Sequence, residues 1–465
     1  MNPSLTEQSF LSLALREALL NNIPFLGYEK MMPIQAKSLP IMLNGHDIIA
    51  QAKTGSGKTA AFGLALLNRL NIENYTVQAL VLCPTRELAE QVSQALRQLA
   101  RLMPNVKILN LSGGIPIKLQ LDSLKHTPQI IVGTPGRVKK HLDKETISLA
   151  KIQTLVLDEA DRMLDMGFYD DISDIIKRCT KKRQTFLFSA TYPPEIKKLA
   201  NEFMQNPKMV VVEEAHAELD IEQIFYEVKS RANKFPLLKE LLLDLKPTST
   251  LIFCNTKDQT SNLASMLTNE GFSAIALNGD MEQVDRDAAI IRFKNQSCSI
   301  LVATDVAARG IDIKDLPAVI NFDLAFDHEV HIHRVGRTGR AGSKGLAISL
   351  ATPADAQRLC AIEDGFGYII SFANANELNV ENDSIIAPEM VTLKLNIGRK
   401  NKIRPGDILG ALSKDAGLEG KFIGKIDITA LYSYVAVHYS KAPMAINYFK
   451  NGKVKGCKVN VKRLG

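Results

Sequence analysis

Cysteine pairs, long apolar runs and a secretion signal are all missing from this sequence of 465 residues. Its six cysteines form no Cys-x-x-Cys pair and lie mostly in apolar, strand-like segments, which argues against a zinc site and for reduced thiols. No apolar stretch reaches the roughly 18 residues that a membrane span requires. The N-terminus carries Glu7 and lacks the basic and apolar segments of a signal peptide. We therefore expect a cytoplasmic protein that does not contact membranes.

The length of the chain predicts two to three domains, because single cores rarely grow beyond about 250–300 residues. Charge is distributed unevenly. Residues 391–465 carry about 15 Lys and Arg against 4 Asp and Glu, a net charge of about +11, and the first 390 residues are near −4. Regular apolar alternation in 391–465 argues against a disordered basic tail. A folded basic module on a near-neutral body is typical of an enzyme tethered to nucleic acid.

Strand-like apolar runs recur along the chain, and each ends in a polar or glycine-containing motif. The first group lies at 47–50, 79–83, 129–132, 155–157 and 185–188, and a second group lies at 250–253, 299–303 and 318–322. Near-continuous apolar strands separated by amphipathic helical patterns, such as 88–101, predict buried parallel sheets. Ligands of such sheets bind at the carboxyl ends of the strands, where these motifs lie. We expect two α/β domains, the second without a phosphate loop.

The basic C-terminal region shows a different order of elements. We predict a strand at 391–397, a helix at 405–414, strands at 422–428 and 432–438, a helix at 442–450 and a strand at 454–463. This βαββαβ order is typical of a ferredoxin-like or RRM-like domain. The predicted organisation is therefore a first domain at 1–208, a second at 218–370, a linker at 371–388 and an RRM-like domain at 389–465.

Two motifs predict nucleotide hydrolysis. The octet at 52–59, Ala-Lys-Thr-Gly-Ser-Gly-Lys-Thr, fits the phosphate-loop pattern G-x-x-x-x-G-K-[ST] with Ala52 at the first glycine. About 100 residues later, the acidic segment Asp-Glu-Ala-Asp at 158–161 directly follows an apolar run. A lysine with backbone N–H groups can hold the β- and γ-phosphates, and a carboxylate can hold Mg²⁺ beside them. A solvated acidic turn would not explain the buried strand that precedes residue 158.

With these motifs and others in the same order, the chain resembles the DEAD-box RNA helicases from about residue 5 to residue 370. The matching segments are 27–35, 52–59, 84–88, 113–114, 134–137, 158–161, 189–191, 253–256, 277–280, 283–286, 303–312 and 333–340. The resemblance implies two tandem RecA-like domains, ATP and Mg²⁺ as cofactors, and RNA as partner. A core followed directly by one short RRM-like domain looks like a subgroup that acts on a 23S rRNA hairpin in pre-50S particles. We expect such a protein to be a monomer.

The resemblance assigns roles around the nucleotide. Gln35 pairs with adenine through its amide and Phe10 stacks on the base, although Gln35 could instead cap the next helix. Met32 replaces a common threonine and removes a hydroxyl contact. The ATP-binding set is Phe10, Gln35, Ala52, Lys53, Thr54, Gly55, Ser56, Gly57, Lys58, Thr59 and, at the ribose, Asp312.

Catalysis is assigned in the same way. Thr59 and Asp158 would hold Mg²⁺, partly through water, and Glu159 would polarise the attacking water as general base. Arg337 and Arg340, three residues apart, would share one face if their segment is helical and would reach the γ-phosphate as arginine fingers. Residues that would couple nucleotide state to RNA binding are Asp161, Ser189, Thr191 and His333, whereas we interpret His331 as structural.

RNA contacts in the core are expected to go to the backbone, because the residues concerned donate N–H, hydroxyl or guanidinium groups suited to phosphates. They are Pro84, Thr85, Arg86, Gly114, Thr134, Gly136 and Arg137 in the first domain, and Arg286 and Thr304 in the second. In the RRM-like domain, Tyr432 and Tyr434 could stack on bases or pack internally, and strand 391–397 would expose Thr392, Lys394 and Asn396. Specificity is expected from basic residues, namely Arg399, Lys400, Lys402, Lys421, Lys425, Lys453 and Lys455.

Three functions remain open at this point. The first is an RNA-dependent ATPase that unwinds short duplexes. The second is an ATP-gated RNA clamp that remodels RNA–protein contacts, which would keep every motif. The third, a DNA translocase, is disfavoured by the acidic box and by the RRM-like domain.

Overall fold

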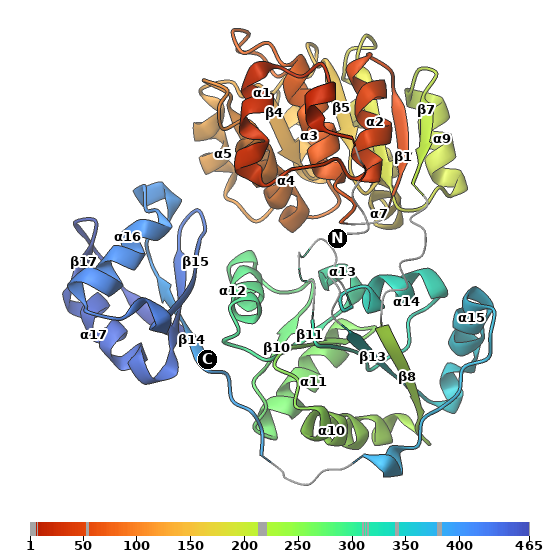
Figure 1. Cartoon of the computed structure of the whole chain (residues 1–465), viewed down its shortest axis with the longest axis vertical. Coiled ribbons are helices and arrows are strands. Elements are labelled where there is room, and N and C mark those ends of the chain that lie inside the picture. The colour runs from red at the N-terminus through yellow and green to blue at the C-terminus, as the bar shows by residue number, and fades with distance from the viewer. Residues whose placement is uncertain are drawn as a thin grey trace. The chain divides into compact units, whose positions relative to one another are not determined.

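The computed structural model describes residues 6, 8–52, 55–212, 221–308, 311, 313, 316–339, 344–378 and 384–464. The chain divides into two compact units, Met1–Ala215 and His216–Gly465 (Figure 1). Among the described residues no helix combines the length and the apolar character needed to cross a bilayer.

The first unit is built on a parallel sheet. Within its described residues the strand order is β3 (Ile108–Leu111), β4 (Ile130–Gly133), β2 (Ala79–Leu82), β5 (Thr154–Leu157), β6 (Gln184–Ser189), β1 (Ile48–Gln51) and β7 (Lys208–Val211). The predicted parallel sheet is therefore confirmed. β7 pairs with β1 at the edge of this sheet and extends beyond residue 208, the end of the domain predicted from the sequence.

Helices cover both faces of this sheet. They are α1 (Glu17–Asn22), α2 (Pro33–Leu43), α3 (Lys58–Arg69), α4 (Arg86–Leu99), α5 (Ile117–Leu124), α6 (Pro135–Asp143), α7 (Ala160–Asp165), α8 (Tyr169–Lys177) and α9 (Pro194–Phe203). Two apolar clusters result, one per face. Residues of α2, α3 and α4 contribute to the first cluster, and residues of α6, α7, α8 and α9 contribute to the second.

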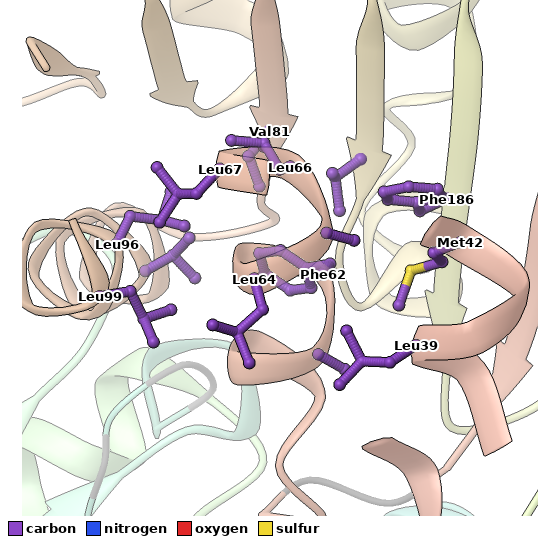
Figure 2. Close-up of a cluster of buried hydrophobic side chains, with 14 of the residues drawn as sticks. Leu39, Met42, Phe62, Leu64, Leu66, Leu67, Val81, Leu96, Leu99 and Phe186 are labelled. Carbon is purple, nitrogen blue, oxygen red and sulfur yellow. The ribbon is translucent and has the colours of Figure 1, made fainter. Parts of the chain in front are cut away.

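Helix α3 lies at the centre of the first cluster, between α4 and α2 (Figure 2). Phe62 of α3 is fully buried and its ring lies 5.4 Å from that of Phe188 on β6. Burial of such a side chain contributes about 1.5–3 kcal/mol. Gly63 lets α4 approach closely, since a Cβ there would lie 2.7 Å from Leu99 Cδ1. This packing fixes the helix that begins at the phosphate loop.

The second unit contains a further parallel sheet. In its described part the strand order is β10 (Ala274–Leu277), β11 (Ile300–Ala303), β9 (Thr250–Phe253), β12 (Ala318–Asn321), β13 (Gly345–Ala351) and β8 (Ile221–Glu227). The accompanying helices are α10 (Lys234–Leu245), α11 (Lys257–Asn269), α12 (Gln283–Lys294), α13 (Asp305–Ala308), α14 (His328–Val335) and α15 (Ala356–Phe366). Part of the predicted linker packs on this domain, because Ala373 N donates to Phe225 O at 2.8 Å and Ile385 contacts the core.

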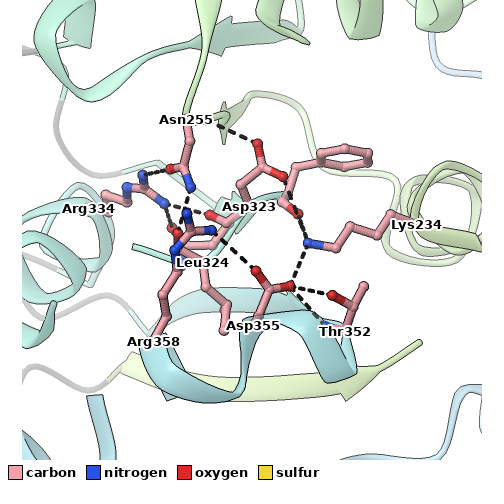
Figure 3. A network of polar contacts seen from close by, with 10 residues as sticks. Lys234, Asn255, Asp323, Leu324, Arg334, Thr352, Asp355 and Arg358 are labelled. Carbon is pink, nitrogen blue, oxygen red and sulfur yellow. Dashed lines mark hydrogen bonds and ion pairs between the residues drawn. The ribbon is translucent and has the colours of Figure 1, made fainter. Parts of the chain in front are cut away.

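A buried polar network anchors α14 in the second domain (Figure 3). Arg334 is 1% exposed and donates to both carboxylate oxygens of Asp305, at 2.6 and 2.7 Å. It also donates to the Asp323 backbone oxygen at 2.7 Å and to Asn255 Oδ1 at 2.8 Å. A buried guanidinium is tolerated only when paired and hydrogen-bonded in this way. The network therefore joins α13, α14 and the ends of β9 and β12.

The C-terminal domain has the predicted βαββαβ order. Its antiparallel sheet has the order β15 (Ile423–Ile428), β16 (Ser433–His438), β14 (Met390–Leu395) and β19 (Val461–Leu464), covered by α16 (Pro405–Gly410) and α17 (Ala442–Asn451). The continuous last strand predicted at 454–463 is wrong. β17 (Lys453–Val454) and β18 (Cys457–Lys458) form a hairpin instead, because Lys455 and Gly456 have φ of 51° and 79°, a left-handed turn.

One face of this sheet is less exposed than predicted. Thr392 is fully buried, and its Oγ1 accepts a hydrogen bond from Asn295 Nδ2 of the second domain at 2.9 Å. The prediction that this strand exposes Thr392 is therefore wrong. Tyr434, on the same face, is only 1% exposed, so its ring is not open to a base. Tyr432 is half-buried, with Lys394 Nζ 4.1 Å from its ring centre.

Candidate nucleotide and nucleic-acid site

The phosphate loop follows β1 and leads into α3. Gly55 and Gly57 have φ of 92° and 89°, which only glycine adopts without strain. Lys58 opens α3 and is 7% exposed, and its Nζ has no hydrogen-bond partner among the described residues. A buried ammonium without a partner is costly unless an anion completes it. Lys53 and Thr54 lie outside the described residues, whereas Ala52 and Ser56 are buried and Gly55 is exposed.

Gln35 links the helix before the phosphate loop to the loop itself. Its Oε1 accepts from Met32 N at 2.8 Å, which caps α2, and its Nε2 donates to Gly57 O at 3.2 Å. A Cβ at Gly57 would lie 2.5 Å from Gln35 Nε2. The capping interpretation of Gln35 therefore matches the structure, and pairing with adenine stays a prediction. Nothing in the sequence indicated the contact with Gly57.

Phe10, expected to stack on the base, is buried. The ring is 2% exposed and lies 6.1 Å from the ring of Tyr28, nearly parallel to it. Stacking of Phe10 on adenine stays a prediction, and it requires the Phe10 ring to become accessible.

The acidic segment follows β5 directly. Asp158 is 3% exposed, and burial, partly offset by the charge of Lys58, raises the pKa of its carboxyl to about 6. Its Oδ1 has no hydrogen-bond partner in the described part of the chain. Glu159 has a φ of 51°, uncommon for a residue other than glycine and typical of strained functional positions. Arg162 Nη1 donates to Glu159 Oε2 at 3.1 Å, an ion pair that the sequence did not reveal.

A magnesium ion fits this donor set. Hard oxygen ligands suit Mg²⁺, and both the unpartnered Asp158 Oδ1 and the half-buried Thr59 are available. We expect these two residues to hold the ion, which would neutralise charge on the bound phosphates.

Asp161 connects the acidic segment to the end of β6. Its Oδ2 accepts from Ala190 N at 3.0 Å, from Thr191 N at 2.9 Å and from Thr191 Oγ1 at 3.1 Å. Ser189 Oγ accepts from Asp161 N at 3.3 Å. Burial would raise the pKa of this carboxyl, but the hydrogen bonds from Thr191 and Ser189 lower it below its ordinary value. Asp161, Ser189 and Thr191, which were expected to couple nucleotide state to RNA binding, are therefore linked by hydrogen bonds.

The expected RNA-contacting residues of the first unit follow three neighbouring strands. Pro84, Thr85 and Arg86 follow β2, Gly114 follows β3, and Thr134, Gly136 and Arg137 follow β4. Thr85 caps α4 by accepting from Leu88 N at 3.2 Å. Arg86 packs on Gly113, where a Cβ would lie 2.8 Å from Arg86 Nε. The carboxyl edge of one sheet thus gathers these groups.

In the second unit, Arg286 of α12 donates through Nη2 to Ala307 O at 2.7 Å. Ala307 N in turn donates to Thr304 Oγ1 at 3.3 Å, so the two expected RNA contacts of this domain lie together. Arg337 donates to Ile311 O at 3.1 Å. It lies beyond the end of α14 at Val335, so the helical face proposed for Arg337 and Arg340 does not form through this helix. Arg340 and Asp312 lie outside the described residues, and His333 is half-buried on α14.

Three family comparisons match this arrangement. Residues 32–199 match the family described as DEAD/DEAH box helicase, 233–342 match the helicase conserved C-terminal domain, and 392–463 match the DbpA RNA binding domain. Among curated proteins, the chain is 50% identical over 448 residues to the ATP-dependent RNA helicase DbpA of Escherichia coli, covering 96% of this chain and 97% of that protein. It is 37% identical to the DbpA of Bacillus subtilis, over 98% of this chain and 99% of that protein.

A solved structure shows the same core. The S. cerevisiae protein Dbp5, bound to RNA and ADP BeF3, matches with a TM-score of 0.71 and 34% identity, over 78% of this chain and 95% of that one.

Proposed function

The chain belongs to the DEAD-box ATP-dependent RNA helicases and carries an RNA-binding domain of the DbpA type, and from this premise we propose that it locally unwinds short duplexes of 23S rRNA during assembly of the large ribosomal subunit. One observation carries the proposal. The unpartnered Lys58 Nζ and Asp158 Oδ1 lie at the same sheet edge as the Asp161–Thr191 bonds. A triphosphate would pair with Lys58 Nζ, Asp158 Oδ1 would help to hold Mg²⁺, and the Asp161–Thr191 bonds would transmit the presence of both.

The chemistry needs little beyond positioning. Lys58 would neutralise charge on the β- and γ-phosphates, and Glu159 would orient the attacking water and accept its proton. Arg162 pairs with the Glu159 carboxylate and so defines its starting orientation. Arg337 and Arg340, from the second domain, would stabilise charge on the γ-phosphate during transfer, a contribution of about 10³-fold or more in rate.

Duplex opening would follow from domain closure. ATP and RNA together would bring the two domains onto one strand, and contacts to its backbone would bend it away from its complement. Phosphate release would then reopen the enzyme. Contacts to phosphates do not read sequence, so the core would act on many duplexes.

Selection of 23S rRNA would come from the C-terminal domain. Its loops are tied together: Arg399 N donates to Thr429 O at 3.0 Å, Lys400 N donates to Ala430 O at 3.1 Å, and Lys455 Nζ donates to Lys402 O at 2.8 Å. Arg399, Lys400, Lys402 and Lys455 are exposed. A cluster of basic loops at one end of a small domain is suited to a folded RNA hairpin. We propose that this protein works in the cytoplasm as a monomer.

The proposal is tested by ATP turnover and strand displacement with the full chain. RNA should stimulate turnover far more than DNA of the same sequence, 23S rRNA fragments should stimulate more than unrelated RNA, and a short tailed duplex should be displaced. Glu159→Gln should lower turnover by about 10²-fold or more and leave ATP binding intact, because the general base is lost while Lys58 is unchanged.

Other outcomes would point elsewhere. ATP consumption without strand displacement would favour an RNA clamp, and equal stimulation by DNA would favour a translocase. Normal turnover in Glu159→Gln would contradict the assignment of the general base.

A further inference from the structure

We propose that Gln120, which lies outside all the helicase motifs, is a positioning residue that joins two RNA-contacting segments of the first domain. These segments are the turn after Ser112, which contains Gly114, and the start of α6, which contains Arg137. The inference rests on the proposed function, because it assumes that both segments contact the RNA backbone.

The side chain of Gln120 bridges the two segments directly. It extends from α5, is 3% exposed, and donates through Nε2 to Ser112 O at 2.9 Å. Its Oε1 accepts from Arg137 Nη1 at 3.1 Å. One buried amide therefore connects the backbone before Gly113 to the guanidinium of Arg137.

The orientation of this amide follows from its partners. The Ser112 carbonyl can only accept and the Arg137 guanidinium can only donate, so Nε2 and Oε1 of Gln120 cannot be exchanged. His141 Nε2 lies 3.0 Å from the same Oε1 and must therefore carry a proton. His141 Nδ1 lies 2.8 Å from Thr146 Oγ1. Burial, with the nearby charge of Arg137, lowers the pKa of His141, so the imidazole is neutral at physiological pH. His141 thus holds Gln120 without adding charge.

The absence of charge on the Gln120 amide matters for how Arg137 binds an RNA phosphate. The guanidiniums of Arg137 and Arg86 repel each other: burial, and then the charge of Arg86, lower the pKa of Arg137. A carboxylate would fix Arg137 more firmly but would cancel the charge that a phosphate needs. An amide fixes the direction of the guanidinium and leaves its charge free for the phosphate. Gln120 therefore keeps Arg137 and the Gly114 turn at a set separation along a bound strand.

The test compares Gln120→Met, which keeps length and volume, with a matched control. Gln129→Met removes another buried glutamine, one that ties its own segment to the loop before β3, since its Oε1 accepts from Lys107 N at 2.9 Å and its Nε2 donates to Asn105 O at 3.2 Å. Gln129 precedes β4, at the opposite end of the strand from Arg137. Gln120→Met loses three side-chain hydrogen bonds and Gln129→Met loses two, so the unfolding midpoint should fall in both variants. Only Gln120 contacts the segments that we expect to bind RNA.

The measurement is ATP turnover of the full chain as a function of RNA concentration. Gln120→Met should raise the RNA concentration for half-maximal stimulation about tenfold, the effect of about 1.4 kcal/mol, while turnover at saturating RNA and the KM for ATP stay within about twofold. Gln129→Met should leave all three values unchanged. Gln120→Glu should also weaken the RNA response, because its carboxylate would pair with Arg137, and it provides the test if Gln120→Met does not fold.

The Arg137→Ala background shows whether Gln120 acts through Arg137. There, Gln120→Met should change the RNA response much less than in the wild type, a non-additivity typical of residues that share one interaction. An unchanged RNA response in Gln120→Met, or an equal change in Gln129→Met, would overturn the inference. A wild-type protein that RNA does not stimulate would instead refute the proposed function.

Discussion

At the scale of single residues, several buried polar groups lie where their surroundings decide their charge. Asp158 is surrounded by Lys58 and the adjacent carboxylates, and Glu159 keeps a left-handed backbone beside Arg162. Such strain persists at functional sites because the surrounding packing over-determines it. His331 is a second kind of case, because burial lowers the pKa of its imidazole and keeps the ring neutral near pH 7.

His331 predicts a measurable loss of stability in acid. It is fully buried between the rings of Phe225 and Phe366, at 5.7 and 5.6 Å, and its Nε2 lies 2.9 Å from Gln223 Oε1. Burial, and then the charge of Arg334, lower its pKa to about 4. Above pH 6.5 neither the folded nor the unfolded imidazole is charged, so His331 has no effect on stability. As pH falls from 6.5 toward 4, only the unfolded state binds the proton, and stability falls.

His331→Gln should remove this acid sensitivity. At about pH 5, buried His331 lowers the free energy of unfolding of the wild type by about 2 kcal/mol. Between about pH 7.5 and pH 5, the variant should therefore lose about 2 kcal/mol less of its free energy of unfolding than the wild type does. Denaturant unfolding of the full chain at both pH values measures it, and the exposed His46→Gln serves as control. An identical pH response in His331→Gln and wild type would show that another group dominates.

At the scale of elements, function depends on where parallel strands end. The motifs follow strands β1 to β6, and the parallel sheet brings the carboxyl ends of these strands to one edge. The link between β5 and β6 is the most explicit of these contacts, because one carboxylate oxygen of Asp161 receives three hydrogen bonds from the segment after β6.

Breaking this link should separate ATP turnover from duplex opening. Thr191→Ala removes the 3.1 Å bond from Thr191 Oγ1 to Asp161 Oδ2 and leaves Lys58, Asp158 and Glu159 untouched. RNA-stimulated turnover should fall by no more than about threefold, whereas strand displacement should fall about tenfold, the effect of about one charge-assisted hydrogen bond. Both rates are measured on the same tailed duplex. Thr180→Ala, before the start of β6, is the control, and equal losses in both activities would contradict the coupling role.

At the scale of the whole molecule, a basic domain of about 75 residues is joined to a near-neutral helicase core. Its buried Thr392 bonds to Asn295 of the second domain, so one face of its sheet is not open to RNA. Binding through its basic loops would hold the core near one RNA site and raise the local substrate concentration.

Removal of residues 388–465 should therefore abolish selectivity and spare the core reaction. The truncated chain should need about 10²-fold more 23S rRNA fragment for half-maximal ATP turnover, because the tether is lost. Its response to an unrelated RNA should change by no more than about threefold, because that RNA uses only phosphate contacts in the core. The full chain with Arg399→Ala and Lys400→Ala should show an intermediate loss. Equal responses of full and truncated chains to the fragment would contradict a targeting role.

The sequence predicted what short spacings determine. A phosphate loop needs its glycines and lysine within about eight residues, and an acidic box after an apolar run predicts a strand end. The sheet edge with Lys58 and Asp158 therefore follows from the amino-acid pattern, whereas the roles expected for Asp161 and Thr191 came from the family resemblance. The βαββαβ order followed from apolar alternation. Turn conformation was harder to predict from the sequence. The apolar pattern predicted one continuous strand, but the left-handed residues Lys455 and Gly456 form a turn that divides it.

Only the tertiary structure decided which distant residues meet. Gln120 reaches Ser112 and Arg137, Gln35 reaches Gly57, and Thr392 meets Asn295 across 97 positions. Hydrogen bonds are short and directional, and a one-dimensional pattern carries no information on which side chains packing brings within about 3 Å of one another. The residues expected to bind were therefore visible in the sequence, whereas the residues that hold them in place were not.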